Sequence, residues 1–383
     1  MKNVMLVCGG ESYEHDISVV TATQIFSKTR LDDVNLIFLY ISRDGTFFVY
    51  ESKKIDLKDF SVSKFSNKNK KFKEVVFVSS EKNKLFVKTF FGLKEYANVN
   101  IAIMCTHGGC GENGRLVSFF EDLNIMTTSG NFDSLAVCMN KYLFKQVMKG
   151  IKLPVVKGFR LKKGEFEKNK KVVKFKLDVL RYPVVIKPAN GGSSIGLFVA
   201  NNEDEFLEKI SDAFLFDNEI LIERFIAGAR EFNVAVIGNG EKLRVSAIDE
   251  PLKNDEVLTF ADKYLKSEGA KKFAEAKCSM VGQKRQLPAV IDEELKEKIQ
   301  SMAMKIFKSL NLCGVVRIDF LYDEALKKLY VCEVNSVPGS LAYYFFSRGF
   351  LINNFVKELI EIAEHKANEQ TKINKEFMPS ILD

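Results

Sequence analysis

The sequence predicts an α/β protein of two or three domains, on three grounds. At the N-terminus an apolar strand (Val4–Cys8), a helical stretch (Ser18–Phe26) and a second apolar strand (Val34–Ile41) follow one another, and this alternation is typical of α/β units. The chain has 383 residues, which corresponds to two or three domains of about 100–200 residues each. Hydrophobic residues make up 46% of the chain, enough to bury ordinary cores, so intrinsic disorder is not expected.

The charge distribution and the N-terminal segment argue against nucleic-acid and membrane partners. The formal charge of +7 arises from 57 basic and 50 acidic residues, with lysines spread along the chain, so we expect no nucleic-acid partner. The opening segment MKNVMLVCGG becomes polar too early for a signal peptide. No stretch approaches the roughly 18 apolar residues of a spanning helix. We therefore expect a cytoplasmic protein without a membrane partner.

The cysteine and histidine content argues against disulfide bonds and against a histidine-ligated zinc site. The seven cysteines are odd in number and mostly lie in apolar, strand-like segments without CxxC spacing, which indicates reduced core thiols. With only three histidines, His15, His107 and His365, the chain is a poor candidate for a histidine-ligated zinc enzyme. Carboxylates, lysines and arginines are the expected carriers of any reaction.

Residues 46–96 differ from the first α/β unit. Short β-prone pieces alternate there with links rich in lysine and asparagine, and we interpret them as hairpins added to the edge of the first domain. These pieces are Thr46–Tyr50, Val75–Val78 and Leu85–Phe91. The next buried strand, Asn100–Cys105, leads into the glycine-rich segment 106–114.

The second half of the chain again alternates helices and strands. A helix Ser134–Lys149 is predicted to end at Gly150, with a strand Val155–Arg160 after it. Further strands are predicted at Pro183–Lys187, Leu221–Phe225 and Glu231–Ile237. Residues 250–290 are polar with little periodicity, and a segment of this length suggests an active-site lid.

The last predicted elements are a helix and a hairpin. Asp292 is the expected N-cap of a helix that Gly314 ends. Its apolar residues have the spacing of one helix face: Leu295, Ile299, Met302, Ile306 and Leu310. The hairpin follows, with strands Val315–Tyr322 and Leu329–Asn335.

This hairpin carries charged residues at constrained positions. Side chains two apart on a strand share a face, so Arg317 and Asp319 point to one side, as do Glu333 and Asn335. Among apolar neighbours, such charged groups must be paired or bound to a metal. Oxygen ligands of this kind suit Mg²⁺ that carries nucleotide phosphates. The alternative is a structural salt bridge of Arg317 with Asp319 or Glu333 on a solvent-facing hairpin.

The loop KPANGGSSIG (187–196) combines a lysine, glycines and serines after a buried strand. Glycines let backbone N–H groups approach an anion, serines add donors, and Lys187 adds a charge. The loop is neither a Walker A motif nor a GxGxxG fingerprint. It therefore predicts phosphate binding of another kind, with a flexible connection as the alternative.

The segment GGESYEHD (9–16) places three acids after the first strand, at the strand edge where ligand sites of α/β proteins collect. This cluster could receive an ammonium group, although acids at a helix start also favour the macrodipole. His107 is likewise either a satisfied turn histidine or part of a site.

Taken together, these segments resemble the D-alanine–D-alanine ligases of the ATP-grasp superfamily. An ordered set of motifs over nearly the whole chain is not expected by chance. In order, the matching segments are GGESYEHDIS (9–18), HGGCGENG (107–114), MNK (139–141), KPANGGSSIG (187–196), Glu223 with ARE (229–231), DKY (262–264), RID (317–319) and EVNSVPG (333–339).

The resemblance implies an ATP-grasp fold of three domains. These would be a Rossmann-like α/β domain (1–130, with the extra hairpins 46–96), a central subdomain (131–225) and a C-terminal subdomain (226–383) with the lid near 250–290. ATP would lie between the last two.

The resemblance also implies the nucleotide and metal ligands. The nucleotide would contact Lys141, Lys187 and Ser194, with Glu223 at the adenine edge, Glu231 at the ribose and Lys263 reaching a phosphate from the lid. Two Mg²⁺ ions, or Mn²⁺ in their place, would be held by Asp319, Glu333 and Asn335.

The implied activity is ATP-dependent ligation of two D-alanines through an acyl phosphate, for peptidoglycan precursor synthesis, by a homodimer. Glu14 would bind the ammonium group of the first D-alanine, and Ser193 and Tyr264 would complete a hydrogen-bond link to it. Arg317 would stabilise the oxyanion of the tetrahedral intermediate. The remaining substrate-binding residues would be His107, Gly339 and Ser340.

Several positions depart from the family pattern. Asn113 stands where the family commonly has Asp, Val117-Ser118 where it has Gln-Gly, and Gly191 where many members have a larger residue. Tyr344 stands where members usually have a serine that binds the acceptor's carboxylate. Two alternatives therefore stay open: the same mechanism with D-lactate, D-serine or another amino acid as acceptor, or an inactive nucleotide-binding homologue. Tyr264 favours an amino acid as acceptor.

Overall fold

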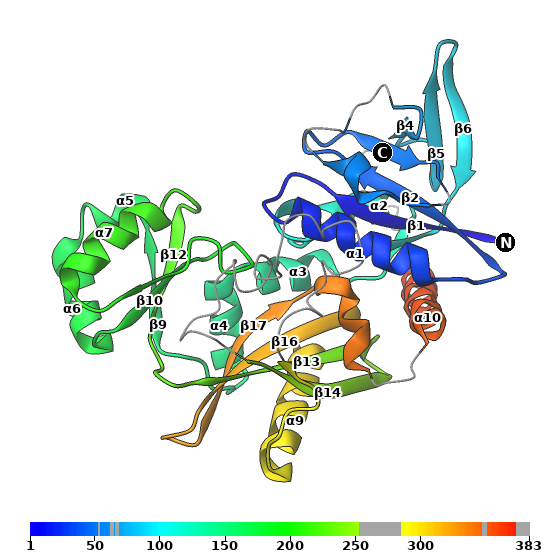
Figure 1. Cartoon of the computed structure of the whole chain (residues 1–383). Coiled ribbons are helices and arrows are strands. Elements are labelled where there is room, and N and C mark those ends of the chain that lie inside the picture. The colour runs from blue at the N-terminus through cyan, green and yellow to red at the C-terminus, as the bar shows by residue number, and fades with distance from the viewer. Residues whose placement is uncertain (53, 62–64, 66–68, 253–284, 347–350, 373–383) are drawn as a thin grey trace, which may run out of the picture.

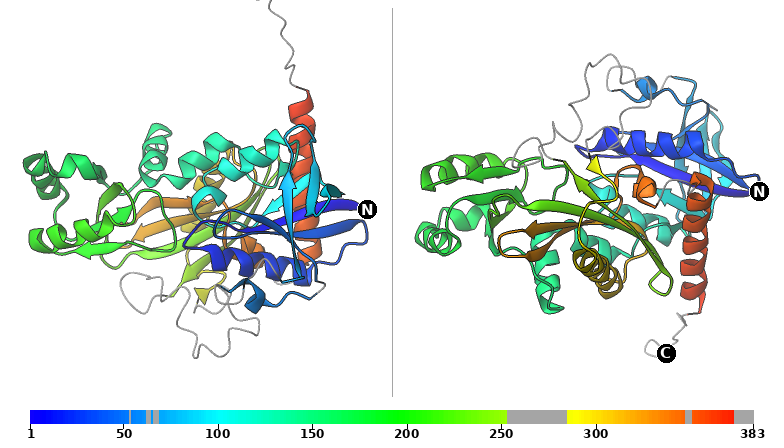
Figure 2. Two further views of the ribbon diagram at one scale, coloured as in Figure 1. Left: turned by 90° about the horizontal axis from the view of Figure 1, so that it is seen from above. Right: turned by 60° about the horizontal axis from the view of Figure 1, so that its bottom comes forward.

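Three β-sheets organise the chain, and in the views of Figures 1 and 2 the third sheet lies between the other two. The computed structural model describes residues 1–52, 54–61, 65, 69–252, 285–346 and 351–372. Each sheet contributes to its own cluster of buried apolar side chains. The α/β class that the sequence predicts is confirmed.

The first sheet is mixed, with eight strands in the order β6-β5-β4-β3-β2-β1-β7-β8. The four strands β2-β1-β7-β8 are parallel, and the others pair antiparallel. The strands are β1 (Lys2–Gly9), β2 (Val34–Ile41), β3 (Phe47–Tyr50), β4 (Phe72–Phe77), β5 (Lys84–Thr89), β6 (Gly92–Asn98), β7 (Ile101–Met104) and β8 (Met126–Thr127). The hairpins expected over residues 46–96 are therefore confirmed, and they extend one edge of this sheet.

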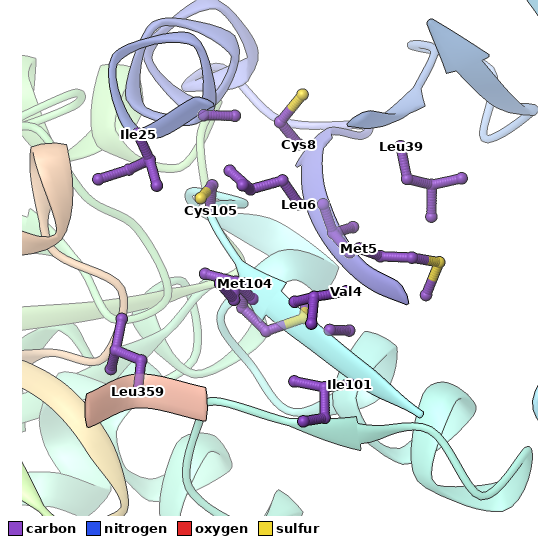
Figure 3. Packing of buried hydrophobic residues seen from close by; sticks show 14 of the residues in the cluster. Val4, Met5, Leu6, Cys8, Ile25, Leu39, Ile101, Met104, Cys105 and Leu359 are labelled. Atoms are coloured by element: carbon purple, nitrogen blue, oxygen red, sulfur yellow. The ribbon is translucent and has the colours of Figure 1, made fainter. Parts of the chain in front are cut away.

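Helices cover both faces of the first sheet. On one face lie α1 (His15–Lys28), the short 3-10 helix η1 (Leu57–Phe60) and α10 (Ile352–Thr371), which contact one another through α1. Ile25 of α1 and Leu359 of α10 both belong to the core that forms around β1 and β7 (Figure 3). Helix α2 (Arg115–Asp122) meets the other face, where Phe119 stacks on Phe47.

The second sheet is antiparallel, in the order β11-β10-β12-β9. Its strands are β9 (Gly158–Lys162), β10 (Val184–Pro188), β11 (Phe198–Ala200) and β12 (Glu219–Arg224). Helices α5 (Lys163–Phe166), α6 (Lys170–Leu180) and α7 (Glu203–Ala213) complete this lobe (Figure 1).

The third sheet is also antiparallel, in the order β15-β14-β13-β16-β17. The strands are β13 (Arg230–Gly238), β14 (Leu243–Pro251), β15 (Arg285–Gln286), β16 (Gly314–Asp323) and β17 (Lys328–Asn335). Helices α3 (Phe132–Met139), α4 (Lys141–Gly150) and α9 (Glu293–Ser309) pack into the same core.

Strand β13 is buried on both faces, and each face packs in a different hydrophobic core. Phe232, Val234 and Val236 pack in the core with α9, whereas Ala235 and Ile237 belong to the core of the first sheet. Asn233 lies on the second of these faces because side chains alternate along a strand. This face of the third sheet therefore meets the N-terminal part of the chain.

Most predicted elements differ from the observed ones by a few residues at their ends, and three differences are more than that. The single helix 134–149 is wrong: α3 and α4 are separate, because Asn140 has extended backbone angles and its side chain accepts from Leu143 N at 2.9 Å as the cap of α4. The strand expected at Val155–Arg160 runs from Gly158 to Lys162, and Val155 instead forms an isolated bridge with Val331.

The third difference concerns Gly314. The N-cap prediction is confirmed, since Asp292 accepts from Leu295 N at 2.7 Å. However, α9 ends at Ser309, and Gly314 begins β16 instead. Glycine is needed there because its φ is +77° and an added Cβ would lie 2.0 Å from the carbonyl oxygen of Thr128.

The segment 250–290 is bounded by strands. Residues 250–251 belong to β14 and pair with residues 285–286 of β15, whereas 253–284 lie outside the described residues. Within the described part of the chain, none of the helices is long and apolar enough to cross a membrane.

Helix α10 is expected to contribute strongly to stability, because its buried face fills the core of the first sheet. Leu359 is 0% exposed, so Leu359→Ala should lower the free energy of unfolding by about 2–5 kcal/mol, measured by urea denaturation. The matched control is Leu326→Ala, which truncates a 60% exposed leucine and should change the value by less than about 0.5 kcal/mol. Equal effects of the two substitutions would contradict this assignment.

Candidate functional site

Loops from all three sheets meet at one cavity of about 50 Å³. They follow β7, β10 and β17, so residues far apart in sequence share one wall. The residues of this first cavity that matter below are Glu14, His107, Glu112, Lys141, Gly191, Gly192, Ser193, Arg317, Glu333 and Gly339. Half of the site residues predicted from the sequence therefore line this one cavity.

Glu14 lies at the N-terminal end of α1, with its carboxylate directed at two loops. Ser193 donates a hydrogen bond from its hydroxyl to Glu14. A Cβ added at Gly192 or at Gly108 would lie 2.7 Å from Glu14 Oε2, which is too close for any side chain. Glycine at both positions is thus a requirement for this contact.

His107 is buried behind the cavity wall. Its Nε2 lies 3.0 Å from Thr21 Oγ1, and the same oxygen accepts from Ser340 N at 3.1 Å. The Ser340 hydroxyl donates to Gln24 Oε1 at 2.6 Å, so Ser340 anchors its turn to α1 and is absent from the lining of the first cavity. Thr21 and Gln24 were not singled out from the sequence, although their spacing of three on one helix face could have indicated a shared role.

The His107 ring is held neutral. Burial, together with the positive charge of Arg317, lowers the pKa of His107 to about 4, while a hydrogen bond with the Val337 backbone acts in the opposite direction. At neutral pH this imidazole therefore carries no charge.

Glu112 is a cavity residue that the sequence analysis did not name, although it lies in the quoted segment HGGCGENG. Its Oε2 accepts from Gly108 N at 2.8 Å and its Oε1 from Val337 N at 3.1 Å. Burial and the nearby charge of Glu14 raise the pKa of Glu112 to about 7. The carboxylate thus ties the loop after β7 to the segment after β17.

A second cavity, of about 160 Å³, lies between the second and third sheets. It shares Lys141, Gly191, Gly192 and Glu333 with the first cavity. Its wall also contains the other predicted residues of this region: Lys187, Ser194, Glu223, Glu231 and Asp319.

Three buried charged residues cluster beside the second cavity, and two of them, Lys187 and Glu223, line it. The carboxylate of Glu223 is paired with Lys187 at 2.6 Å and also with Lys145. Lys145 was not among the residues predicted from the sequence. It lies one turn after Lys141 on α4, and this spacing could have indicated that the two lysines share a helix face. Lys141 itself donates to the Gly191 carbonyl and lies 3.5 Å from Glu333 Oε2.

This cluster keeps its charges despite burial. Burial would raise the pKa of Glu223, but the two lysines outweigh it and lower the pKa below the ordinary value. Burial would likewise lower the pKa of Lys187, and the carboxylate of Glu223 raises it instead. An arrangement of fixed positive groups beside a cavity suits an anionic ligand such as a phosphate.

The hairpin register agrees with the prediction. Arg317 pairs with Asn335 and Asp319 with Glu333, so all four side chains share one face. Arg317 donates from Nε and Nη2 to the two oxygens of Asp319, both at 2.7 Å. The salt bridge considered as the alternative thus exists, but both residues are buried, so the solvent-facing hairpin is excluded.

The polar face continues across the third sheet. The register places Asp249 beside Asn233 on β13, Asn233 beside Asp319, and Asp319 beside Glu333. The buried oxygen Asn233 Oδ1 finds no hydrogen-bond donor within the described ranges. Such a row of oxygen atoms differs from an ordinary sheet core, which is apolar.

The residues expected to hold magnesium are compatible with it in chemistry. Asp319, Glu333 and Asn335 offer two carboxylates and an amide, the hard oxygen ligands that Mg²⁺ prefers. Among the described residues, no three His, Cys, Asp or Glu side chains form a metal cluster by themselves, so the set depends on the amide. Burial raises the pKa of Asp319, and Arg317 opposes this rise.

Two of the predicted residues, Lys263 and Tyr264, lie outside the described residues. Tyr344, by contrast, is well placed: its hydroxyl accepts from Arg285 Nη1 at 3.2 Å, and the same nitrogen lies 3.2 Å from Asp249 Oδ2. Burial raises the pKa of the Tyr344 hydroxyl, and the positive charges of Arg285 and Arg317 oppose this rise.

Two antiparallel sheets that enclose a cavity lined by lysines and acids, next to a Rossmann-like sheet, define the class: this is the ATP-grasp fold. Family models described as "D-ala D-ala ligase N-terminus" and "D-ala D-ala ligase C-terminus" match residues 3–129 and 147–361. A D-alanine–D-alanine ligase of Thermosipho melanesiensis is 34% identical over 365 residues, 95% of this chain and 94% of the relative. The chain belongs to the D-alanine–D-alanine ligase family.

Solved structures agree with this assignment of the fold. The D-alanine-D-alanine ligase from Coxiella burnetii is similar with a TM-score of 0.77 and 23% identity, over 97% of this chain and 96% of that one. VanG D-Ala:D-Ser ligase from Enterococcus faecalis has a TM-score of 0.75 and 25% identity, over 94% and 99% of the two chains. D-alanine–D-alanine ligase from Bacillus anthracis, complexed with ATP, has a TM-score of 0.67 and 18% identity, over 97% and 100%.

The buried, neutral state of His107 predicts a pH dependence of stability. Its folded pKa of about 4 lies below the unfolded value of about 6.5, so between these pH values the unfolded chain binds more protons. The free energy of unfolding should therefore fall as the pH drops from about 6.5 to 4, by up to about 1.4 kcal/mol per pH unit from this group. Urea denaturation of the parent protein and of His107→Gln at each pH measures this contribution, which is the difference between the two pH dependences. An NMR titration that finds the His107 ring protonating near pH 6.5 would contradict it.

Proposed function

We propose that the protein joins two D-alanines to D-alanyl-D-alanine at the expense of ATP, through an acyl phosphate. One observation carries this proposal: the first and second cavities share Lys141, Gly191, Gly192 and Glu333. A carboxylate bound in the first cavity would thus lie next to the terminal phosphate of a nucleotide bound in the second. Family membership and the similarity to a ligase complexed with ATP support it.

The second cavity is proposed to bind the nucleotide. Lys141, Lys187 and Ser194 would contact its phosphates or adenine, as their positions on α4, β10 and the loop after β10 suggest. Glu223 would meet the adenine edge and Glu231 the ribose. Lys263 would add a contact to a phosphate.

Magnesium is proposed to join the nucleotide at the hairpin. Asp319, Glu333 and Asn335 would hold it, and when bound it would supply charge neutralisation of the transferring phosphoryl group. The chain itself keeps Arg317 beside these ligands, close to the carbonyl that is to be attacked.

The first cavity is proposed to bind the amino acids. Glu14, fixed by Ser193, would receive the ammonium group of the first D-alanine, with Tyr264 completing the link. His107 and Gly339 would line the substrate, and Ser340 would act by anchoring the turn that carries Gly339. Arg317 would stabilise the negative oxygen that forms when the second amine attacks.

The setting of this reaction follows from the product. We propose that the dipeptide serves peptidoglycan precursor synthesis in the cytoplasm and that the enzyme acts as a homodimer. The division into residues 1–130, 131–225 and 226–383 also stays a proposal. Helix α10 of the unit 226–383 packs on the first sheet, and α4 of the unit 131–225 packs in the core of the third sheet. Each unit would therefore contribute a helix to the core of another.

Phosphate release tests the reaction directly. Release from ATP should require D-alanine, and Arg317→Ala should lower kcat by about 100- to 1,000-fold, because one oxyanion donor is removed. Arg160→Ala is a matched control, since Arg160 lies on β9, outside the lining of both cavities, and stacks on Tyr142. Absence of release with every D-amino acid would refute the proposal and favour an inactive nucleotide-binding homologue.

A second candidate function differs only in the acceptor. The Arg285, Tyr344 and Asp249 cluster near Arg317 favours it, because a buried arginine beside a tyrosine hydroxyl can bind an acceptor's carboxylate in place of a serine.

An acceptor panel separates the two candidates. With D-alanine as donor, D-alanine, D-serine, D-lactate and other amino acids are offered together at equal concentration. We expect mass spectrometry to find D-alanyl-D-alanine as the main product, because relatives that match over nearly the whole chain are D-alanine–D-alanine ligases. A dominant depsipeptide or D-alanyl-D-serine would establish the second candidate instead.

A further inference from the structure

The acceptor amine must lose a proton before it can react, and the proposed function so far names no group that takes it. At neutral pH an amino acid carries an ammonium group, which has no lone pair for attack on a carbonyl. A positioned base that removes this proton accelerates such steps by about 100- to 10,000-fold. Both amino acids are proposed to bind in the first cavity, so the base must belong to it.

The carboxylate of Glu112 is fixed in that cavity from two sides. Gly108 N donates to its Oε2 at 2.8 Å, and Val337 N donates to its Oε1 at 3.1 Å. The Ser336 hydroxyl also donates to the Glu112 carbonyl at 3.4 Å. Each carboxylate oxygen retains a second lone pair. The group is therefore held rigidly and can still accept a proton.

The titratable groups around Glu112 come from several neighbouring elements. They are Glu14 at the start of α1, Cys138 on α3, Lys141 on α4, Arg317 on β16, Glu333 on β17 and His107 in its own loop. Lys141 is paired with Glu333, and Arg317 is paired with Asp319 outside this set. Glu14 accepts from Ser193.

Glu112 differs from these neighbours because it forms no ion pair with any residue in the described part of the chain. The proposed reaction brings two ammonium groups into this cavity. Glu14 would serve the ammonium group that stays bound, which leaves Glu112 for the one that reacts.

We propose that Glu112 is the general base of the coupling step, a role that rests on the proposed function. Its carboxylate takes one proton from the acceptor's ammonium group, and the freed nitrogen lone pair forms the C–N bond with the carbonyl carbon of the acyl phosphate. The bond from that carbon to the phosphate oxygen breaks, and the phosphate leaves with the electron pair. The second proton of the amine passes to the phosphate, and Glu112 returns its own proton to solvent.

Titration behaviour is consistent with this role. Burial and the charge of Glu14 raise the pKa of Glu112 to about 7, and a base is most effective when its pKa lies near the working pH. His107 is another candidate proton acceptor in the lining of the cavity. Its pKa of about 4 and its contact with Thr21 make it a weaker acceptor of protons.

The test uses two nucleophiles with the same acyl phosphate. Glu112→Gln keeps the size of the side chain and should lower kcat/KM for the acceptor D-alanine by about 100-fold or more. Hydroxylamine is largely unprotonated at neutral pH, so it needs no base. The variant should therefore form D-alanyl hydroxamate from ATP and D-alanine at the rate of the parent protein. Glu121→Gln, which changes a half-buried glutamate paired with Lys366, should leave both rates unchanged.

The pH profile gives a second readout. In the parent protein the coupling rate should rise with pH through about 7, because Glu112 acts in its ionised form. In Glu112→Gln this rise should move to higher pH, where the amine itself loses its proton. An unchanged profile with an unchanged coupling rate would overturn the proposal.

A merely structural role has a different signature. If Glu112 only ties the two loops together, hydroxamate formation should fall as far as dipeptide formation, which would also overturn the proposal. Should Glu112→Gln fail to fold, Glu112→Asp answers the same question: selective loss of dipeptide formation supports the base, and equal loss of both products opposes it. Failure of the proposed function is distinguishable, because the parent protein would then form neither product.

Discussion

The contact between Glu14 and the loop after β10 is the constraint on which the rest of the site depends. Glu14 belongs to the first lobe and Ser193 to the second, and their hydrogen bond joins the two. Gly108 and Gly192 leave room for the carboxylate where no side chain would fit. The contact brings the loop after β10, whose Gly191 and Gly192 line both cavities, against the first lobe. The proposed chemistry requires that the two cavities adjoin.

The structure also buries several charged side chains, and ion pairs and hydrogen bonds offset the free energy of removing them from water. Glu223 is enclosed by Lys145 and Lys187, and Asp319 by Arg317 and Asn335. Burying ion pairs in this way is a poor route to stability, since desolvation offsets much of the attraction. The clusters are better understood as fixed fields for an anionic ligand, held in place before the ligand arrives. Their concentration around two adjoining cavities supports that interpretation.

The sequence predicted strands and the residues at their ends well, because these follow from local pattern. The register of Arg317, Asp319, Glu333 and Asn335 was deduced from a period of two residues. The break at Asn140 was not, because the apolar pattern continues through it and only the capping geometry interrupts the helix. Glu112 and Lys145 escaped notice for another reason: their importance comes from partners on other elements, Val337 and Glu223, which no local pattern reveals.

The sequence by itself determined the fold class, the family resemblance, the glycine-rich loops and the shared face of the charged hairpin. These are properties of short segments, in which residue type and spacing dictate backbone conformation and side-chain direction. Only the tertiary structure decided which segments meet: that α10 completes the first core, that Thr21 and Gln24 anchor Ser340, and that Glu112 faces the same cavity as Glu14. The physical reason is that burial and the approach of distant charges, which set the pKa values of His107 and Glu112, exist only once the lobes have packed together.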